Sequence, residues 1–171
     1  MTAQSPGPRE YVVSYAAAHS WAELWPKVMQ SRAALLSELL DVSEERAARR
    51  PAGGEGEDAW SMIQVLQHVV TYTRNVAAII ESTARGETAT KDPPGAIHDV
   101  PAGALGSLLE VLVDASADLA VLYRRLPGEP DLETKVAHPG FGPFNCREWF
   151  LFLTVHDDSH RKQIVALKQM D

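Results

Sequence analysis

HPGFGPFNCREWFLFLTVHDDSHRKQI, residues 138–164, carries the strongest structural signals in this chain. It begins as a Gly/Pro turn, meets a helix start at Asn145 with Glu148 three residues on, and continues as an apolar amphipathic segment. Two histidines one helical turn apart, His156 and His160, lie in its apolar stripe rather than on its polar face. At this spacing two imidazoles can reach one metal ion, so the segment predicts a helix that carries part of a metal site.

A Ser-x-x-Glu capping pattern opens a predicted helix over residues 20–40. Pro26 leaves two alternatives for its start: the helix is kinked in its second turn, or regular helix begins at Pro26 itself. The polar run 43–50 is expected to make another turn or two. Residues 51–58, which include three glycines, form a predicted loop.

The next predicted helix carries a third histidine. Ser61 with Gln64 repeats the capping pattern, and Gly86 can end the helix after about Arg85. His68 lies at the edge between the apolar face of this helix and its polar side, a position from which an imidazole can reach inward.

Residues 87–100 form the longest predicted loop between helices. Fourteen extended residues at ~3.3 Å each can return the length of a helix, so the helices on either side can run parallel. The third predicted helix along the chain spans residues 102–126, with a leucine seam, and a Pro/Gly-rich segment at 127–130 stops it. Four helices, one long crossover between the second and third, and no convincing alternating strand predict an all-α four-helix bundle.

Composition narrows the class of protein. With 171 residues, 45% of them hydrophobic, the chain is expected to form one domain over residues 20–171, preceded by a mobile or loosely docked N-terminal arm over residues 1–19. The net charge of −7 argues against nucleic acid as a partner. The single cysteine excludes an internal disulfide. No signal peptide and no apolar run of ~18 residues is present, so a cytoplasmic location without membrane insertion is expected.

Three buried or half-buried histidines need an explanation, because an imidazole without a partner costs about 1–3 kcal/mol. One cation bound by three neutral nitrogens removes that cost and leaves coordination positions open. Cys146 precedes His156 by about 15 Å of helix, too far to be a fourth ligand, and is expected to be a small buried residue. His138 is expected in a loop, although its turn can bring it over the start of the last helix.

Other polar and aromatic residues near the stripe have alternative roles. Asp157 and Asp158 are expected to be solvated or ion-paired, and only Asp157 lies near enough to the stripe to support a ligand from behind. Trp60, Trp149 and Tyr72 are expected to pack in the core, with the alternative that one of them lines a substrate pocket.

Two segments taken together, WSMIQVLQHVV at residues 60–70 and the stretch 138–164, resemble the DinB/YfiT-like family of bacterial four-helix metalloproteins. The resemblance extends over roughly residues 20–168. It implies an up-down-down-up bundle, frequent dimers, and a divalent metal at one end of the core. It also implies that the metal is bound by His68, His156 and His160. Members include thiol S-transferases and isomerases that use bacillithiol, mycothiol or glutathione.

Three functions follow as hypotheses. The first is a metal-dependent thiol S-transferase acting on a small-molecule substrate with a low-molecular-weight thiol as co-substrate. The second is a metal-dependent hydrolase, and the third is a non-catalytic, stress-related metal-binding dimer. Three imidazoles do not select one metal: zinc or nickel is favoured, with iron or manganese as alternatives. The resemblance also implies a homodimer.

Overall fold

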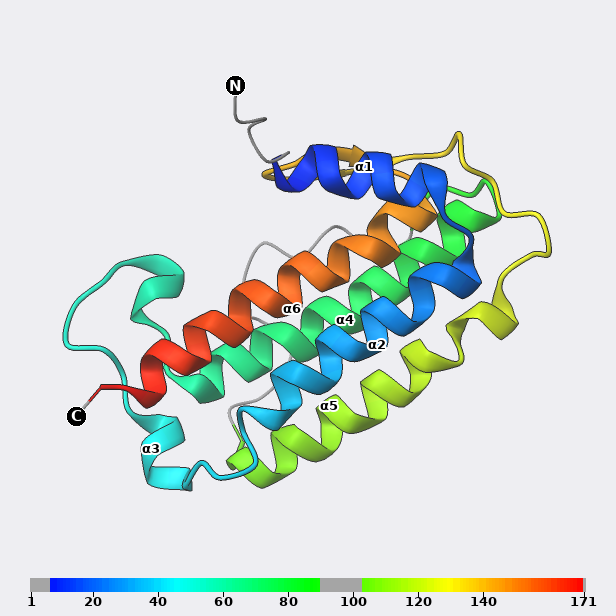
Figure 1. Cartoon of the computed structure of the whole chain (residues 1–171). Helices are drawn as coiled ribbons and strands as arrows, with labels where there is room; N and C mark the ends of the chain where they lie inside the picture. The colour runs from blue at the N-terminus through cyan, green and yellow to red at the C-terminus, as the bar shows by residue number, and fades with distance from the viewer. Residues whose placement is uncertain (1–6, 90–102, 171) are drawn as a thin grey trace.

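Four long helices lie side by side in the computed structural model, which describes residues 7–89 and 103–170 (Figure 1). Two of them, α2 and α6, run in one direction, and α4 and α5 run in the other. The predicted all-α, up-down-down-up four-helix bundle is therefore confirmed. The bounds of these helices are Trp21–Ser37 for α2, Met62–Ala84 for α4, Leu105–Ala120 for α5 and Cys146–Lys168 for α6.

The parallel course of α4 and α5 requires a connection that returns along the bundle (Figure 1). The 23 residues of α4 rise about 35 Å at 1.5 Å per residue, so a long crossover between the two helices is needed. Most of the predicted crossover, and the predicted helix start at Ala102, lie outside the described residues. In the described part, α5 begins at Leu105.

Capping boxes begin three of the four bundle helices at the predicted residues. At α6, the Glu148 amide donates to Asn145 Oδ1 at 3.0 Å, and the Asn145 amide donates to Glu148 Oε2 at 2.8 Å. Ser20 and Ser61 begin α2 and α4 in the same way. These reciprocal bonds satisfy amides that have no partner within the helix, which is why the starts could be read from a four-residue pattern.

The ends and connections differ more from the expectation. Pro26 lies inside α2, so the alternative of a helix that starts at Pro26 is wrong. The polar run 43–50 contains the expected short helix, and the loop that follows it contains a 3-10 turn. The third bundle helix ends at Ala120 and tightens into a second 3-10 turn. The short elements are α3 (Glu44–Ala48), η1 (Gly56–Ala59) and η2 (Leu122–Arg125).

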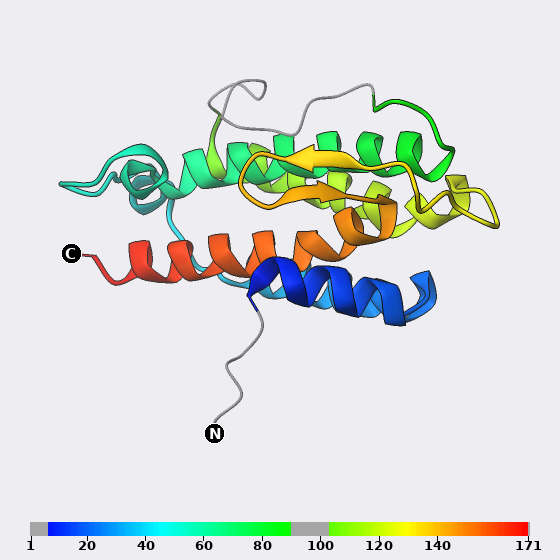
Figure 2. The same ribbon diagram turned by 90° about the horizontal axis from the view of Figure 1, so that it is seen from above.

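The expected loose N-terminal arm is wrong for residues 8–18, which form helix α1 (Pro8–Ala18) and lie along α6 (Figures 1 and 2). Val12 and Ala16, one turn apart, are 0% and 2% exposed. The small residues of this segment suggested disorder, but they also let a helix approach its neighbour closely. Arg9 fixes the helix further by donating to the carbonyl oxygens of Phe141 and Pro143.

A two-stranded antiparallel hairpin leads into α6, where a Gly/Pro turn without strands was expected (Figure 2). Strand β1 (Val136–His138) pairs with β2 (Gly142–Phe144), and His138 is opposite Gly142. Strands of three residues are too short to show the alternation by which a strand is recognised in a sequence. The hairpin places His138 beside the bundle.

Two core clusters fill the bundle. The first core cluster includes Val76 and Trp149, and the second includes Leu66 and Ile164. On α6 the stretch between the two clusters contains His156, near the middle of the helix. The histidines therefore lie between two apolar clusters rather than at one end of the core, where the family resemblance had placed the metal.

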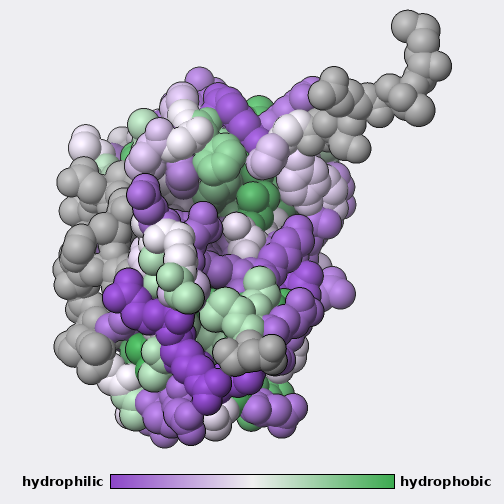
Figure 3. Space-filling model, turned by 90° about the vertical axis from the view of Figure 1, so that its left-hand side faces the viewer, coloured by the Kyte–Doolittle hydropathy of each residue, from purple (hydrophilic) through white to green (hydrophobic). Residues whose placement is uncertain are grey.

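The end of the bundle that carries α3 has a mixed surface. Figure 3 shows hydrophilic residues around small apolar areas on this face. Such scattered apolar exposure is ordinary for a protein surface and points to no interface by itself.

Candidate metal centre

Three histidines from two helices converge in the interior. α4 supplies His68, and α6 supplies His156 and His160, and the three residues are 5%, 8% and 4% exposed. The Nε2 atoms of His68 and His156 are 3.0 Å apart. One ring nitrogen from each of the three lies within 4.8 Å of the other two. This spacing is compatible with three ligands to a single ion.

In His156 and in His160, one ring nitrogen is available to the histidine cluster, because the other ring nitrogen lies near a different side chain. His160 Nδ1 is 2.9 Å from Gln163 Oε1, so Nδ1–H donates to the amide oxygen and the Nε2 lone pair is available. Gln163 in turn donates to the Glu57 carbonyl oxygen, which fixes its own orientation. His156 presents Nε2 to His68, while its Nδ1 lies 3.7 Å from Asp157 Oδ1.

Burial keeps at least two of these rings neutral. Burial, together with the nearby His156 and His160, lowers the pKa of His68 to about 2. Burial is also the main cause that lowers the pKa of His156 to about 4, although Asp157 opposes it. Both are neutral imidazoles at neutral pH, the form that binds a metal. The donor set therefore fits a divalent cation.

A cavity of about 320 Å³ opens beside the three histidines. One wall is aromatic and comes from the hairpin and α6, and the polar lining residues include Glu57 and Ser159. The residues that line the cavity are Glu57, His68, Tyr72, His138, Pro139, Phe141, Phe152, Val155, His156, Ser159 and His160. An ion held by the histidines would therefore have space beside it for a small molecule.

His138, expected in a loop, is placed on the wall of this cavity by the hairpin. Its ring centroid lies 4.7 Å from that of Phe152 and 5.0 Å from that of Phe141. The Gly140 amide donates to His138 Nδ1 at 3.0 Å, so in the neutral ring Nε2 carries the proton. Burial lowers the pKa of His138, which favours that neutral ring. His138 thus adds a hydrogen-bond donor to the wall.

Tyr72 and Trp60 do more than pack in the core. The Tyr72 ring stacks on His156 at 3.6 Å between centroids, and its hydroxyl is buried without a hydrogen-bond partner among the described residues. Burial and Asp157 raise the pKa of Tyr72 well above its usual value, so it stays a phenol. The Trp60 ring lies 5.1 Å from that of His68. Of the three aromatic residues considered from the sequence, Tyr72 is the one that lines the cavity.

Arg32, which was not predicted to belong to the site, is 2% exposed and lies directly behind it. Its guanidinium donates to both carboxylate oxygens of Asp157, at 2.8 and 2.9 Å. Asp157 is 0% exposed and hence ion-paired rather than solvated. One signal could have revealed Arg32: it follows Val28 by one helical turn and so lies in the apolar stripe of α2.

Cys146 is buried, and its thiol contacts the Asp131 carbonyl oxygen at 3.3 Å. Burial raises its pKa to about 11, so the reactive thiolate is scarce at neutral pH. We expect native protein at about pH 8 to react with dithiobis-nitrobenzoate at least about 100-fold more slowly than a free thiol. In denatured protein one thiol per chain should react, which releases one nitrothiobenzoate per chain. A rapid native reaction would show that Cys146 is accessible.

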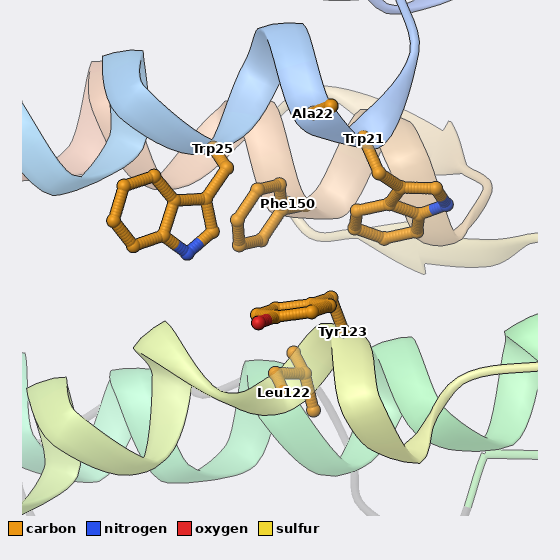
Figure 4. Close-up of a pocket in the computed structure, with 6 residues that line it drawn as sticks. All are labelled: Trp21, Ala22, Trp25, Leu122, Tyr123 and Phe150. Carbon is orange, nitrogen blue, oxygen red and sulfur yellow. The ribbon is translucent and has the colours of Figure 1, made fainter.

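A second cavity, of about 450 Å³, lies between α2 and η2 and is apolar (Figure 4). Trp21 and Trp25 from α2 and Phe150 from α6 face Tyr123 and Leu122 across it. None of its described lining residues is a histidine, an acid or a base. Its described lining residues therefore offer no imidazole or carboxylate ligand for a metal ion.

Comparison with known proteins agrees with this architecture. A family profile described as the DinB superfamily matches residues 28–164, a range that contains all three histidines. Among solved structures, the chain is similar to one described as a crystal structure of TT2238, a four-helix bundle protein. The identity is 23%, the TM-score is 0.61, and the match covers 89% of this chain and 100% of that one. At this identity the likeness concerns the fold alone. No curated protein matches the chain.

Proposed function

The chain belongs to the DinB superfamily, and from that premise and the histidine cluster we propose that it is a metal-dependent thiol S-transferase. His68, His156 and His160 would hold the divalent ion. The observation that carries the proposal is that three buried imidazoles converge at the wall of a small-molecule-sized cavity. Zinc or nickel is the proposed ion, with iron or manganese as alternatives, because neutral imidazoles bind all four.

The cavity favours an enzyme over a structural ion. The two core clusters, one on each side of the histidines, already hold the helices together with apolar contacts. An ion that only joined helices would need no open space beside it, whereas three protein ligands next to a cavity of about 320 Å³ leave room for an exchangeable ligand. This comparison disfavours the non-catalytic metal-binding dimer.

A bound divalent ion would lower the pKa of a coordinated thiol, so that the thiolate forms at neutral pH. The residues of the cavity supply the rest. Phe141 and Phe152 offer an apolar surface for the electrophile, and His138 offers a neutral N–H donor. The cavity volume of about 320 Å³ suits a small molecule, and we propose that it receives the sulfur end of a low-molecular-weight thiol together with a small electrophile.

A hydrolase is the second candidate, and one observation favours it. Glu57 is one of the residues around the cavity, and in this version its carboxylate is the proposed group that accepts a proton from the attacking water. In this version the same ion would lower the pKa of water instead of a thiol.

The test uses cobalt-loaded protein, whose absorption spectrum reports the ligands of the ion. We expect the correct thiol among glutathione, bacillithiol, mycothiol, coenzyme A and cysteine to change the spectrum and to release about one proton per site at neutral pH. The same thiol should then react with a generic electrophile faster with loaded wild-type protein than with His68→Ala. If all five thiols leave the spectrum unchanged, the transferase is wrong and hydrolysis becomes the leading candidate.

Two further expectations concern the whole molecule. A homodimer and a cytoplasmic location remain predictions. No helix in residues 7–89 or 103–170 has the length and hydropathy needed to cross a membrane.

A further inference from the structure

Arg32 ties together the four helices of the bundle at the level of the histidines. From α2 it binds both oxygens of Asp157 on α6. It also donates to Thr73 Oγ1 on α4 at 2.9 Å and to Ser116 Oγ on α5 at 3.2 Å. Thr73 and Ser116 are in turn bonded to carbonyl oxygens of their own helices, which fixes their hydroxyl groups. The guanidinium therefore holds the Asp157 carboxylate in one orientation.

Asp157 lies next to a candidate ligand. Its Oδ1 is 3.7 Å from His156 Nδ1, longer than a hydrogen bond but close enough for the carboxylate to attract a proton on that nitrogen. His156 Nδ1 is buried and has no other partner in the described part of the chain. A carboxylate on this side favours the tautomer with the proton on Nδ1. That tautomer leaves the Nε2 lone pair free on the side of His68.

A buried ion pair is not by itself evidence of a more stable core. Replacing a buried ion pair with apolar side chains of similar volume is often neutral or stabilising. The neighbouring carboxylate on the same helix, Asp158, is ion-paired at the surface instead. It lies 2.6 Å from Lys162 and 3.1 Å from Arg161, away from the histidines. A charged pair placed between the four helices and beside His156 therefore has a role that packing alone does not explain.

We propose that Arg32 and Asp157 are positioning residues that orient His156 and select the tautomer in which its Nε2 can bind a metal. The proposal deepens the metal site of the proposed function and rests on it for the identity of the ligand. It assigns Arg32 no contact with substrate. Thr73 and Ser116 contribute by fixing the guanidinium.

The experiment compares the double variant Arg32→Met/Asp157→Leu with the control Asp158→Asn. The double variant removes both charges together, so no unpaired charge remains in the core and the fold should persist. We expect it to bind cobalt about 10- to 100-fold more weakly than wild type, the usual cost of losing a group that orients a metal-bound histidine. Asp158→Asn should bind cobalt within about twofold of wild type, because Asp158 does not face His156.

A second measurement needs no metal. In metal-free protein labelled with nitrogen-15 at histidine, His156 should carry its proton on Nδ1. In the double variant its signals should shift toward a mixture of tautomers. If the double variant does not fold, Arg32→Lys is measured in its place. This variant keeps the charge but not the two-oxygen fork, so a loss of cobalt affinity and a tautomer shift in the same direction, smaller than for the double variant, are expected, and wild-type values of both would overturn the proposal.

The outcomes separate the two proposals. Wild-type affinity for cobalt together with an unchanged His156 tautomer in the variant would overturn the positioning role and leave the metal site intact. Failure of the wild-type protein itself to bind cobalt would contradict the proposed function. The tautomer measurement would then still decide whether Arg32 and Asp157 control the protonation of His156.

Discussion

Replacement of His68, His156 or His160 by alanine is expected to abolish binding of the divalent ion while the chain stays folded. Each variant removes one of the three proposed protein ligands, and the affinity should fall by more than about 100-fold, because even the loss of a supporting group behind a ligand costs about 10- to 100-fold. The fold should persist, since the two core clusters lie on either side of the site. Truncation creates a cavity but also removes a buried polar group, so the two effects partly offset.

Elemental analysis of tag-free protein and thermal unfolding of the metal-free forms check this prediction. His19→Ala is a suitable control, because His19 bonds to the Tyr15 carbonyl oxygen at the end of α1 and stacks on the Tyr15 ring. It should retain the wild-type metal content. Unfolding of the His156→Ala variant would show that the ion is structural, and full metal content in any of the three variants would show that the ligands are misassigned.

Local patterns explain why so much of the bundle could be predicted. The capping box at Asn145 depends on residues three apart in sequence, and the pairing of His156 with His160 depends on residues four apart. Such signals are complete within one helical turn. The convergence of His68 on them needed more, namely its placement at the edge of a second amphipathic helix and the family resemblance.

Features that depend on distant residues could not be predicted in the same way. His138 reaches the cavity only because three-residue strands form a hairpin, and helix α1 is fixed in part by Arg9 bonding to carbonyl oxygens more than a hundred residues later. Arg32 was missed for a related reason. Its partner Asp157 is 125 positions away, and an arginine in a helix is by default assigned to the surface. The position of Arg32 in the apolar stripe of α2 indicates burial, but its role follows only once Asp157 is known to be its counter-charge.

The buried pair also gives the largest expected change in stability. Arg32→Met should lower the free energy of unfolding by about 3–5 kcal/mol, because the Asp157 carboxylate would remain buried without its counter-charge. Arg161→Met is the matched control: Arg161 pairs with Asp158 at 3.1 Å, but both side chains are partly exposed, so the loss should stay below about 1 kcal/mol. Urea unfolding followed by circular dichroism measures both.

The pH dependence identifies the cause of that loss. Burial alone would raise the pKa of Asp157, but Arg32 lowers it below its usual 3.8, so in wild type the pair stabilises the fold at neutral pH and is lost only in stronger acid. In Arg32→Met the buried carboxyl has no cation beside it, and its pKa should rise above the unfolded value. As the pH falls from 7 toward about 4, protonation removes the buried charge of Asp157 in the variant. The deficit of the variant, that is, its lower free energy of unfolding relative to wild type, should therefore shrink. A deficit that stays constant over this range would show that lost packing around Arg32, rather than the unpaired charge of Asp157, destabilises the variant.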